Sequence, residues 1–475
     1  MQPPVGASGA LLNPVDAFDV PVLVRRSSPL APGRRPHPSH IERADQSWPV
    51  VNDVPPDGLY RVQTTWRDII DAALTVGRDP TAWLASVPNL AWSEIVARRS
   101  PLVAYLGRQP RSGDNRYRIE PNVVYREGTE RSARGAFGYR LGMTMAEWAC
   151  RGLMGLGPTT HAEAVTPGNA GSAWSNVSSL PDLVGDHPGT PTTWLVEAKG
   201  HRKVPRSALL KGARQLSNPN LLTGPHMRVL CGASLEPQLF MSIDIEAVVT
   251  EECSGRQADA DPVSDDEALL ALARSRMLLY LALIAIPVTE RRIVPVGPAS
   301  AVAGRSRNGT VSLLEFDSTT NQERLEARDR DRYEGRDGRE RRDMLTGRVP
   351  GTDLIIGMSR RLFAACGSLA AVQRRVAIEV DRKQPQPTAS ERELMSEDNL
   401  AIRYEQRRAL YWQRERALTA ETVASTRARF EEGQQRNWQA LLGRQVPITV
   451  DAPADVLEAA TTDTYLAVDT RTATR

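Results

Sequence analysis

Apolar residues recur at helical spacing in several parts of this chain. Between residues 136 and 156 they form one stripe, and the segment Gly155 to Pro158 would end that helix. A similar pattern over 58–92 predicts a small helical subdomain, which we assign to residues 56–129. Further helices are expected over about 207–216 and around the apolar segment 277–288.

Short strand-like segments alternate with these helices. They are expected at 161–165, 180–185, 193–199, 228–234 and 240–249. The resulting order after the long helix is three strands, a helix and two strands, which indicates an α/β core over residues 130–250. An apolar helix and a strand at 311–316 would extend this core over 251–318.

The remaining parts of the chain are polar or charged. Residues 1–55 are rich in Pro and Arg, which predicts a disordered or loosely draped arm. Residues 323–343, in the segment 319–348, hold eight acids and eight arginines, as in a solvated helix or linker rather than a nucleic-acid surface. Region 349–475 is expected to be helical, with one helix from a capping box at Ser390 and Glu393 to about 418, and another over 419–442.

Composition limits the class of protein. In 475 residues, 60 Lys and Arg balance 57 Asp and Glu, so the overall charge does not require a nucleic-acid partner. The four cysteines are widely spaced, which suggests neither a disulfide framework nor a zinc site. No secretory signal is expected, and the apolar segment 277–288 is too short to cross a bilayer. We therefore expect a soluble cytoplasmic protein with no membrane partner.

One strand pair gathers chemically useful side chains. Alternation along 193–199 places Glu197 and Lys199 on the same face. The turn signal at 186–191 predicts a hairpin folded about residues 189 and 190, which would place Asp182 opposite Glu197. Only four lysines occur in the chain, so a lysine at this position is unusual. The plain alternative is a surface hairpin with an ordinary Glu–Lys pair.

Two adjacent carboxylates repel each other unless a cation neutralises them. Hard oxygen ligands select Mg²⁺, with Mn²⁺ as an alternative. A bound ion would polarise a phosphate oxygen and generate hydroxide, and Lys199 could position the water or offset charge at phosphorus.

These residues give the chain a resemblance to a known group of enzymes. Pro181-Asp182, fourteen intervening residues and Glu197-Ala198-Lys199 resemble the signature of the PD-(D/E)xK, or restriction-endonuclease-like, nuclease superfamily. The resemblance implies a core of order α-β-β-β-α-β, Asp182 and Glu197 as metal ligands, and Lys199 as the catalytic lysine. It covers about a quarter of the chain, and long additions lie on either side.

The resemblance also suggests supporting residues. Glu147 on the preceding helix would be a third metal ligand, and an exposed helix glutamate is the equal alternative. Gln215 on the following helix would be a further catalytic residue near the site, and with Lys211, four residues before it, would contact DNA or a catalytic water. His201, Arg202 and Lys203 follow the strand and suit a phosphate backbone, although a solvated loop has the same composition.

The leading interpretation is a Mg²⁺-dependent DNA endonuclease of a restriction or phage-defence system. No Gly-Lys dipeptide occurs, so no P-loop is expected. The alternative is a non-catalytic nucleic-acid-binding or scaffold protein with a nuclease-like fold. RNA is a further substrate possibility, because nothing in the hairpin reads the 2′-hydroxyl. Duplex cleavage by this fold usually needs one site per strand, so a homodimer is expected.

Overall fold

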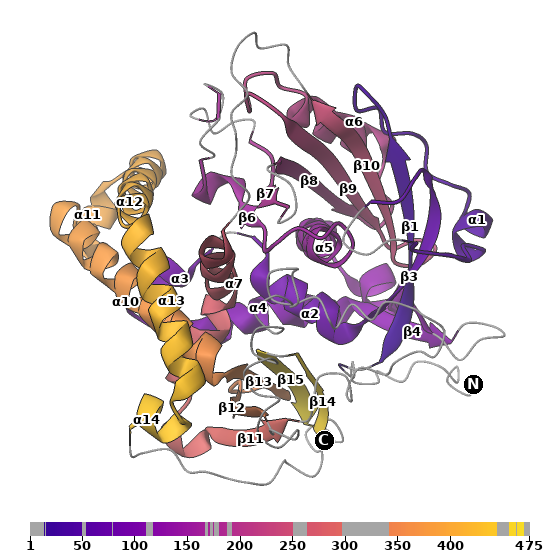
Figure 1. Ribbon diagram of the computed structural model, residues 1–475. Coiled ribbons are helices and arrows are strands. Elements are labelled where there is room, and N and C mark those ends of the chain that lie inside the picture. The colour runs from indigo at the N-terminus through magenta and orange to yellow at the C-terminus, as the bar shows by residue number, and fades with distance from the viewer. Residues whose placement is uncertain are drawn as a thin grey trace.

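The computed structural model describes most of the chain. The described residues are 14, 16–49, 54–77, 79–110, 117–166, 170–171, 174, 180–187, 192–249, 264–296, 342–443, 456–461 and 463–469. The protein is mixed α/β, with a large mixed sheet, a smaller antiparallel sheet and helices around both (Figure 1).

The large sheet contains the predicted α/β core. Its strands follow the order β2-β3-β1-β10-β9-β8-β7-β6, and β5 joins β1 and β4 beside this path. Their bounds are β1 Ala17–Arg26, β2 Gln46–Ser47, β3 Gly58–Thr65, β4 Leu106–Pro110, β5 Tyr117–Pro121, β6 Thr160–His161, β7 Leu183–Asp186, β8 Thr193–His201, β9 His226–Ser234 and β10 Phe240–Val249. The strands β6, β7 and β8 form an antiparallel meander, and β9 lies parallel to β8.

Two helices cover opposite faces of this core. Helix α5, Arg131–Gly152, packs on the face where Trp194, Val196 and Ala198 join the main hydrophobic cluster. Helix α6, Arg206–Leu216, packs on the other face, where Leu195 and Leu230 join a second cluster. Alternation along β8 therefore sends successive side chains to different helices. The predicted order of helix, three strands, helix and two strands is present as α5, β6, β7, β8, α6, β9 and β10.

The expectation for residues 1–55 was wrong over Ala17–Arg26. This segment is a central strand, parallel to β10 and antiparallel to β3. Its residues Phe18, Val20, Val22 and Val24 alternate and are buried, but Pro21 interrupts the sequence pattern. Proline is unusual in a central strand because it lacks a backbone N–H donor. Pro21 and the Pro and Arg residues on either side of the strand therefore concealed the alternation in the sequence.

The region 56–129 contains the expected helices, but it is not a separate helical subdomain. Its helices are α2 Trp66–Thr75, α3 Thr81–Leu84 and α4 Leu90–Tyr105, followed by a π-helical turn, η1, at Val124–Gly128. The strands β3, β4 and β5 belong to the large sheet, and Trp66, Ile69 and Ile70 join the main cluster with residues of α5.

A second sheet, of order β11-β12-β13-β15-β14, was not expected from the sequence. Its strands are β11 Arg292–Val296, β12 Arg342–Arg348, β13 Leu354–Ser359, β14 Val456–Ala460 and β15 Thr464–Asp469. All of its pairings are antiparallel. The sheet lies below the large one in Figure 1. Region 349–475 is therefore not purely helical.

The C-terminal helices differ from the expected hairpin. They are α10 Arg360–Lys383, α11 Ala389–Leu394, α12 Glu397–Ala417, α13 Thr419–Gln435 and α14 Trp438–Leu442. The capping box is formed by Thr388 and Glu391, two residues before the predicted Ser390 and Glu393. Ser396 caps α12, so the single helix expected from Ser390 to 418 is divided in two.

Helix α7, Asp265–Ala285, contains most of the apolar segment. Among the described residues it is the one helix long and apolar enough to cross a membrane. It packs against α4, α10 and α13, and it carries the fully buried Arg276, as the core helix of a folded domain does. The predicted strand 311–316 and the charged run up to 341 lie outside the described residues.

Candidate functional site

The hairpin of β7 and β8 has the register that the sequence predicted. Leu183 pairs with Val196, and Gly185 pairs with Trp194. Extending this register by one residue places Asp182 opposite Glu197, on the face covered by α6. The tip of the hairpin, 188–191, lies outside the described residues.

Backbone hydrogen bonds fix Asp182 at the start of β7. The amide of Ala198 donates to the Asp182 carboxylate at 2.8 Å. The amide of Ala162, on the neighbouring segment after β6, donates to the Asp182 carbonyl oxygen at 3.1 Å. Asp182 is therefore held between two strands, with its carboxylate against β8.

Glu197 is the most buried carboxylate of the pair, with only 1% of its surface exposed. Its Oε1 accepts a hydrogen bond from the ammonium of Lys199. Its Oε2 is buried and has no hydrogen-bond partner among the described residues. A buried carboxylate oxygen without a partner is costly, and a cation is one way to satisfy it.

Burial and the neighbouring charges shift the pKa values of both carboxyl groups. Burial and the neighbouring Asp182 carboxylate raise the pKa of Glu197 to about 8, although Lys199 opposes the shift. Burial also raises the pKa of Asp182, against the effects of the Ala198 amide and of Lys199. The register and these contacts therefore place Asp182, Glu197 and the Lys199 amine next to one another.

Helix α6 covers the pair closely. A Cβ at Gly212 would lie 2.7 Å from Leu230 Cδ1, 3.1 Å from Glu197 Cγ and 3.3 Å from Lys199 Cε, so a larger residue here would have to displace these side chains. Gln215 donates from its side chain to the carbonyl oxygen of Leu180, two residues before Asp182. Gln215 thus supports the segment that leads to Asp182, while Lys211 on the same helix is exposed.

Glu147 is placed elsewhere. It is fully buried on α5, the helix that covers the opposite face of the sheet. Its carboxylate accepts a hydrogen bond from the Thr159 hydroxyl and lies 3.8 Å from Arg151. Burial raises the pKa of Glu147, and Arg151 opposes the shift. The exposed-glutamate alternative is excluded, but the side chain joins a buried ion cluster and not the Asp182–Glu197 pair.

Two carboxylates are thus available for a metal ion at the hairpin. Within the described part of the chain, no three His, Cys, Asp or Glu side chains converge closely enough to form a ligand cluster. Mg²⁺ commonly retains several waters and binds through one or two carboxylates together with substrate phosphates. The unpartnered Glu197 Oε2 and the adjacent Asp182 carboxylate therefore fit Mg²⁺ or Mn²⁺ bound by protein and water together.

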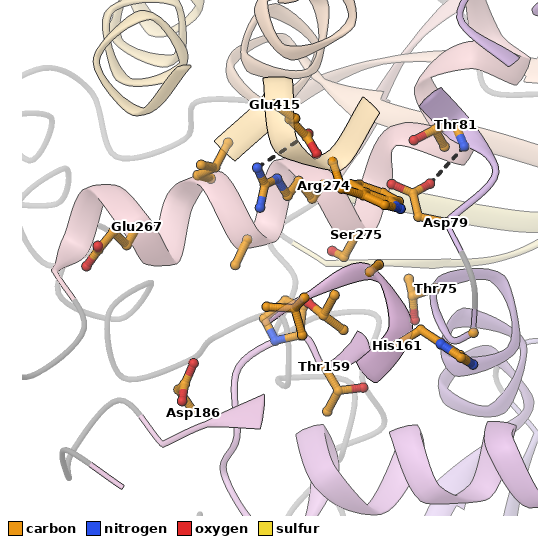
Figure 2. Close-up of a pocket in the computed structure, with 18 of the residues that line it drawn as sticks. Thr75, Asp79, Thr81, Thr159, His161, Asp186, Glu267, Arg274, Ser275 and Glu415 are labelled. Atoms are coloured by element: carbon orange, nitrogen blue, oxygen red, sulfur yellow. Dashed lines mark hydrogen bonds and ion pairs between the residues drawn. The ribbon is translucent and has the colours of Figure 1, made fainter. Parts of the chain in front are cut away.

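A separate cavity of about 540 Å³ lies between the meander and the helices α7 and α12. Thr159, His161 and Asp186 contribute from the meander side, and Arg274 and Glu415 form an ion pair on the opposite wall (Figure 2). The Asp182–Glu197 pair does not line this cavity. No local pattern indicates this cavity, because its walls come from segments as far apart in the chain as Thr75 and Glu415.

His161 and Thr159 were also missed by the sequence reasoning. His161 pairs with Leu183, next to Asp182, and its positive form would lower the pKa of Asp182. Thr159 is the hydrogen-bond donor to the buried Glu147. A single histidine or threonine in a loop carries no recognisable spacing, so the sequence alone could not distinguish either residue.

Comparisons of this chain with protein-family models, with curated proteins and with solved structures find no match.

Proposed function

We propose that this protein is a metal-dependent nuclease that hydrolyses phosphodiester bonds of DNA, as an endonuclease in restriction or phage defence. The observation that carries the proposal is the convergence of the Asp182 and Glu197 carboxylates beside the Lys199 amine. Such a trio is poorly suited to a purely structural role, because burial of like charges costs stability. The similarity to PD-(D/E)xK nucleases and the observed element order support the same proposal.

Each side chain has a part in the proposed reaction. Asp182 and Glu197 would hold Mg²⁺ or Mn²⁺, and the bound ion would supply Lewis-acid activation of the phosphate and a low water pKa. Lys199 is close enough to Glu197 to orient the attacking water and to offset charge at phosphorus. The water oxygen would form a bond to phosphorus while the opposite P–O bond breaks; the water would release a proton to solvent, and the leaving oxygen would take up a proton from solvent.

The proposal is tested by cleavage of plasmid DNA with Mg²⁺ or Mn²⁺, using Asp182→Ala and Lys199→Ala. We expect both variants to lose at least about a hundredfold in rate, because each removes a group acting on the reacting phosphate, and to retain DNA binding. Lys383→Ala is the matched control, since Lys383 is an exposed lysine that pairs with Glu379 on α10. A wild type that cuts neither DNA nor RNA with either metal would refute the proposal.

One observation favours the alternative, a non-catalytic nucleic-acid-binding or scaffold protein. Glu147, the expected third ligand, belongs to the buried cluster on the other face of the sheet. In that case DNA would bind with equal affinity with and without metal, and no cleavage would follow. The same binding and cleavage measurements on wild type therefore separate the two functions.

A further inference from the structure

Four basic residues gather where strand β8 ends and helix α6 begins. Arg202 and Lys203 follow β8, Arg206 opens α6, and Arg35 comes from the segment between β1 and α1, Pro38–Glu42. The segment after β1 is attached to α6, because Arg206 Nε donates to the carbonyl oxygen of Pro32 at 3.4 Å. We call these four residues the basic patch.

Arg35 is the unusual member of the basic patch. Its guanidinium carbon lies 5.4 Å from the centre of the Phe240 ring. Its Nε and Nη2 atoms are buried and have no hydrogen-bond partner among the described residues. Burial lowers the pKa of Arg35, and Glu236 opposes the shift. These two nitrogens are closed to an outside ligand, but the Arg35 side chain as a whole is only partly buried and forms no ion pair with an acid among the described residues, so its positive charge can attract a phosphate.

The other basic residues around Arg35 outnumber the acids that pair with them. Glu236, the acid that acts on Arg35, is already paired with Arg202. Lys203 and Arg206 are exposed and form no ion pair with an acid in the described ranges. The basic patch therefore carries more positive charge than its own acids neutralise, which attracts a polyanion.

The basic patch is continuous with the candidate site. His201, Ser234 and Phe240 form one row across β8, β9 and β10, so Arg35 above Phe240 lies on the same end of the sheet as His201. Lys199 is two residues before His201 on the same strand. A DNA strand, which carries one phosphate per about 3.4 Å of helix axis, could therefore pass from the Lys199 amine over the end of β8.

We propose that Arg35, Arg202, Lys203 and Arg206 bind consecutive phosphates of the DNA strand and hold it across the Asp182–Glu197 pair. This inference rests on the proposed function. It adds a substrate contact from the N-terminal segment, which lies outside the region that resembles the nuclease superfamily.

The test is equilibrium binding of a short DNA duplex in EDTA, measured over a range of salt concentrations. EDTA prevents cleavage, so the result does not depend on catalysis. Each lost phosphate contact reduces the slope of log K against log salt by about 0.9. We expect Arg35→Gln and Lys203→Gln each to lower the slope by about this amount, and the double variant by about twice as much.

Arg43→Gln is the matched control, because Arg43 lies in the same N-terminal segment but bonds to Ser39 of its own helix. It should leave both affinity and slope unchanged. If the wild type binds and the Arg35 and Lys203 variants match it, the phosphate contacts are refuted, whatever the cleavage assay with metal shows. If the wild type does not bind DNA but cleaves RNA, the proposed DNA contacts of the basic patch are refuted while the proposed phosphodiester hydrolysis stands.

Discussion

At the scale of single residues, the chemistry of the site depends on Glu197. Its folded-state pKa is about 8 against an ordinary value of 4.5, because it is buried beside Asp182. The folded protein therefore binds a proton that the unfolded chain releases between these two pH values. Stability must fall as the pH rises through this window, by at most about 1.4 kcal/mol per pH unit.

Glu197→Gln tests this dependence, since glutamine keeps the shape and cannot ionise. We expect the variant to gain stability over wild type as the pH rises from 5 to 8 in EDTA, measured by urea unfolding. Ionisable groups distant from Glu197 contribute similarly to both proteins, so the difference reports Glu197 together with its coupled neighbour Asp182. A difference that stays constant across this pH range would show that Glu197 ionises normally.

The same residues show why the site was predictable. Asp182, Glu197 and Lys199 lie on a single hairpin, whose register follows from the two-residue period and a local turn. Glu147 is on another element, and its partners Asp71 and Arg276 are distant in sequence. No local pattern indicates which face of the sheet its helix covers, so its position required the structure.

At the scale of elements, the site depends on how closely α5 packs on β8. A Cβ at Gly142 would lie 2.7 Å from the amide nitrogen of Gly200 and 2.9 Å from the carbonyl carbon of Lys199. These neighbours are backbone atoms and cannot rotate away. Any side chain at this position must therefore separate the helix from the strand that carries Glu197.

Gly142→Ala should cost about 1–3 kcal/mol in the free energy of unfolding, as overpacking usually does. Gly135→Ala is the matched control on α5, because its Cβ would meet no atom within 4 Å. The control should be neutral or gain up to about 1 kcal/mol from helix propensity. Urea unfolding distinguishes the two, and equal stabilities would contradict the close packing.

Elements with strong local signals were predicted well. Strand β10 has the expected bounds, and α6 begins within one residue of its expected start. Strand β1 was missed because Pro21 interrupts it, and the second sheet because β13 pairs with a strand more than 100 residues later. Pairing over such distances leaves no periodicity in any short window.

At the scale of the whole molecule, buried ions connect the two sheets and their helices. Arg276 of α7 has no exposed surface and pairs with Asp71 of α2, which also contacts Arg151 of α5 at 3.1 Å. One turn earlier on α2, Arg67 donates to Thr464 of β15 at 2.7 Å. Helix α2 therefore contacts both α5, which covers the large sheet, and the C-terminal sheet.

This arrangement predicts that the two sheets unfold together and that Arg276 stabilises both of them. Arg276→Met keeps a side chain of similar volume but leaves Asp71 and Glu147 with Arg151 as their nearby cation. The substitution should lower the free energy of unfolding by about 3–5 kcal/mol. Arg429→Met, on an exposed pair with Glu432 of α13, should cost less than about 1 kcal/mol. Urea unfolding followed by both far-UV circular dichroism and tryptophan fluorescence should give a single, shifted transition for Arg276→Met. Two transitions, with only one moved by the substitution, would mean that the sheets are stabilised independently and that the buried cluster does not join them.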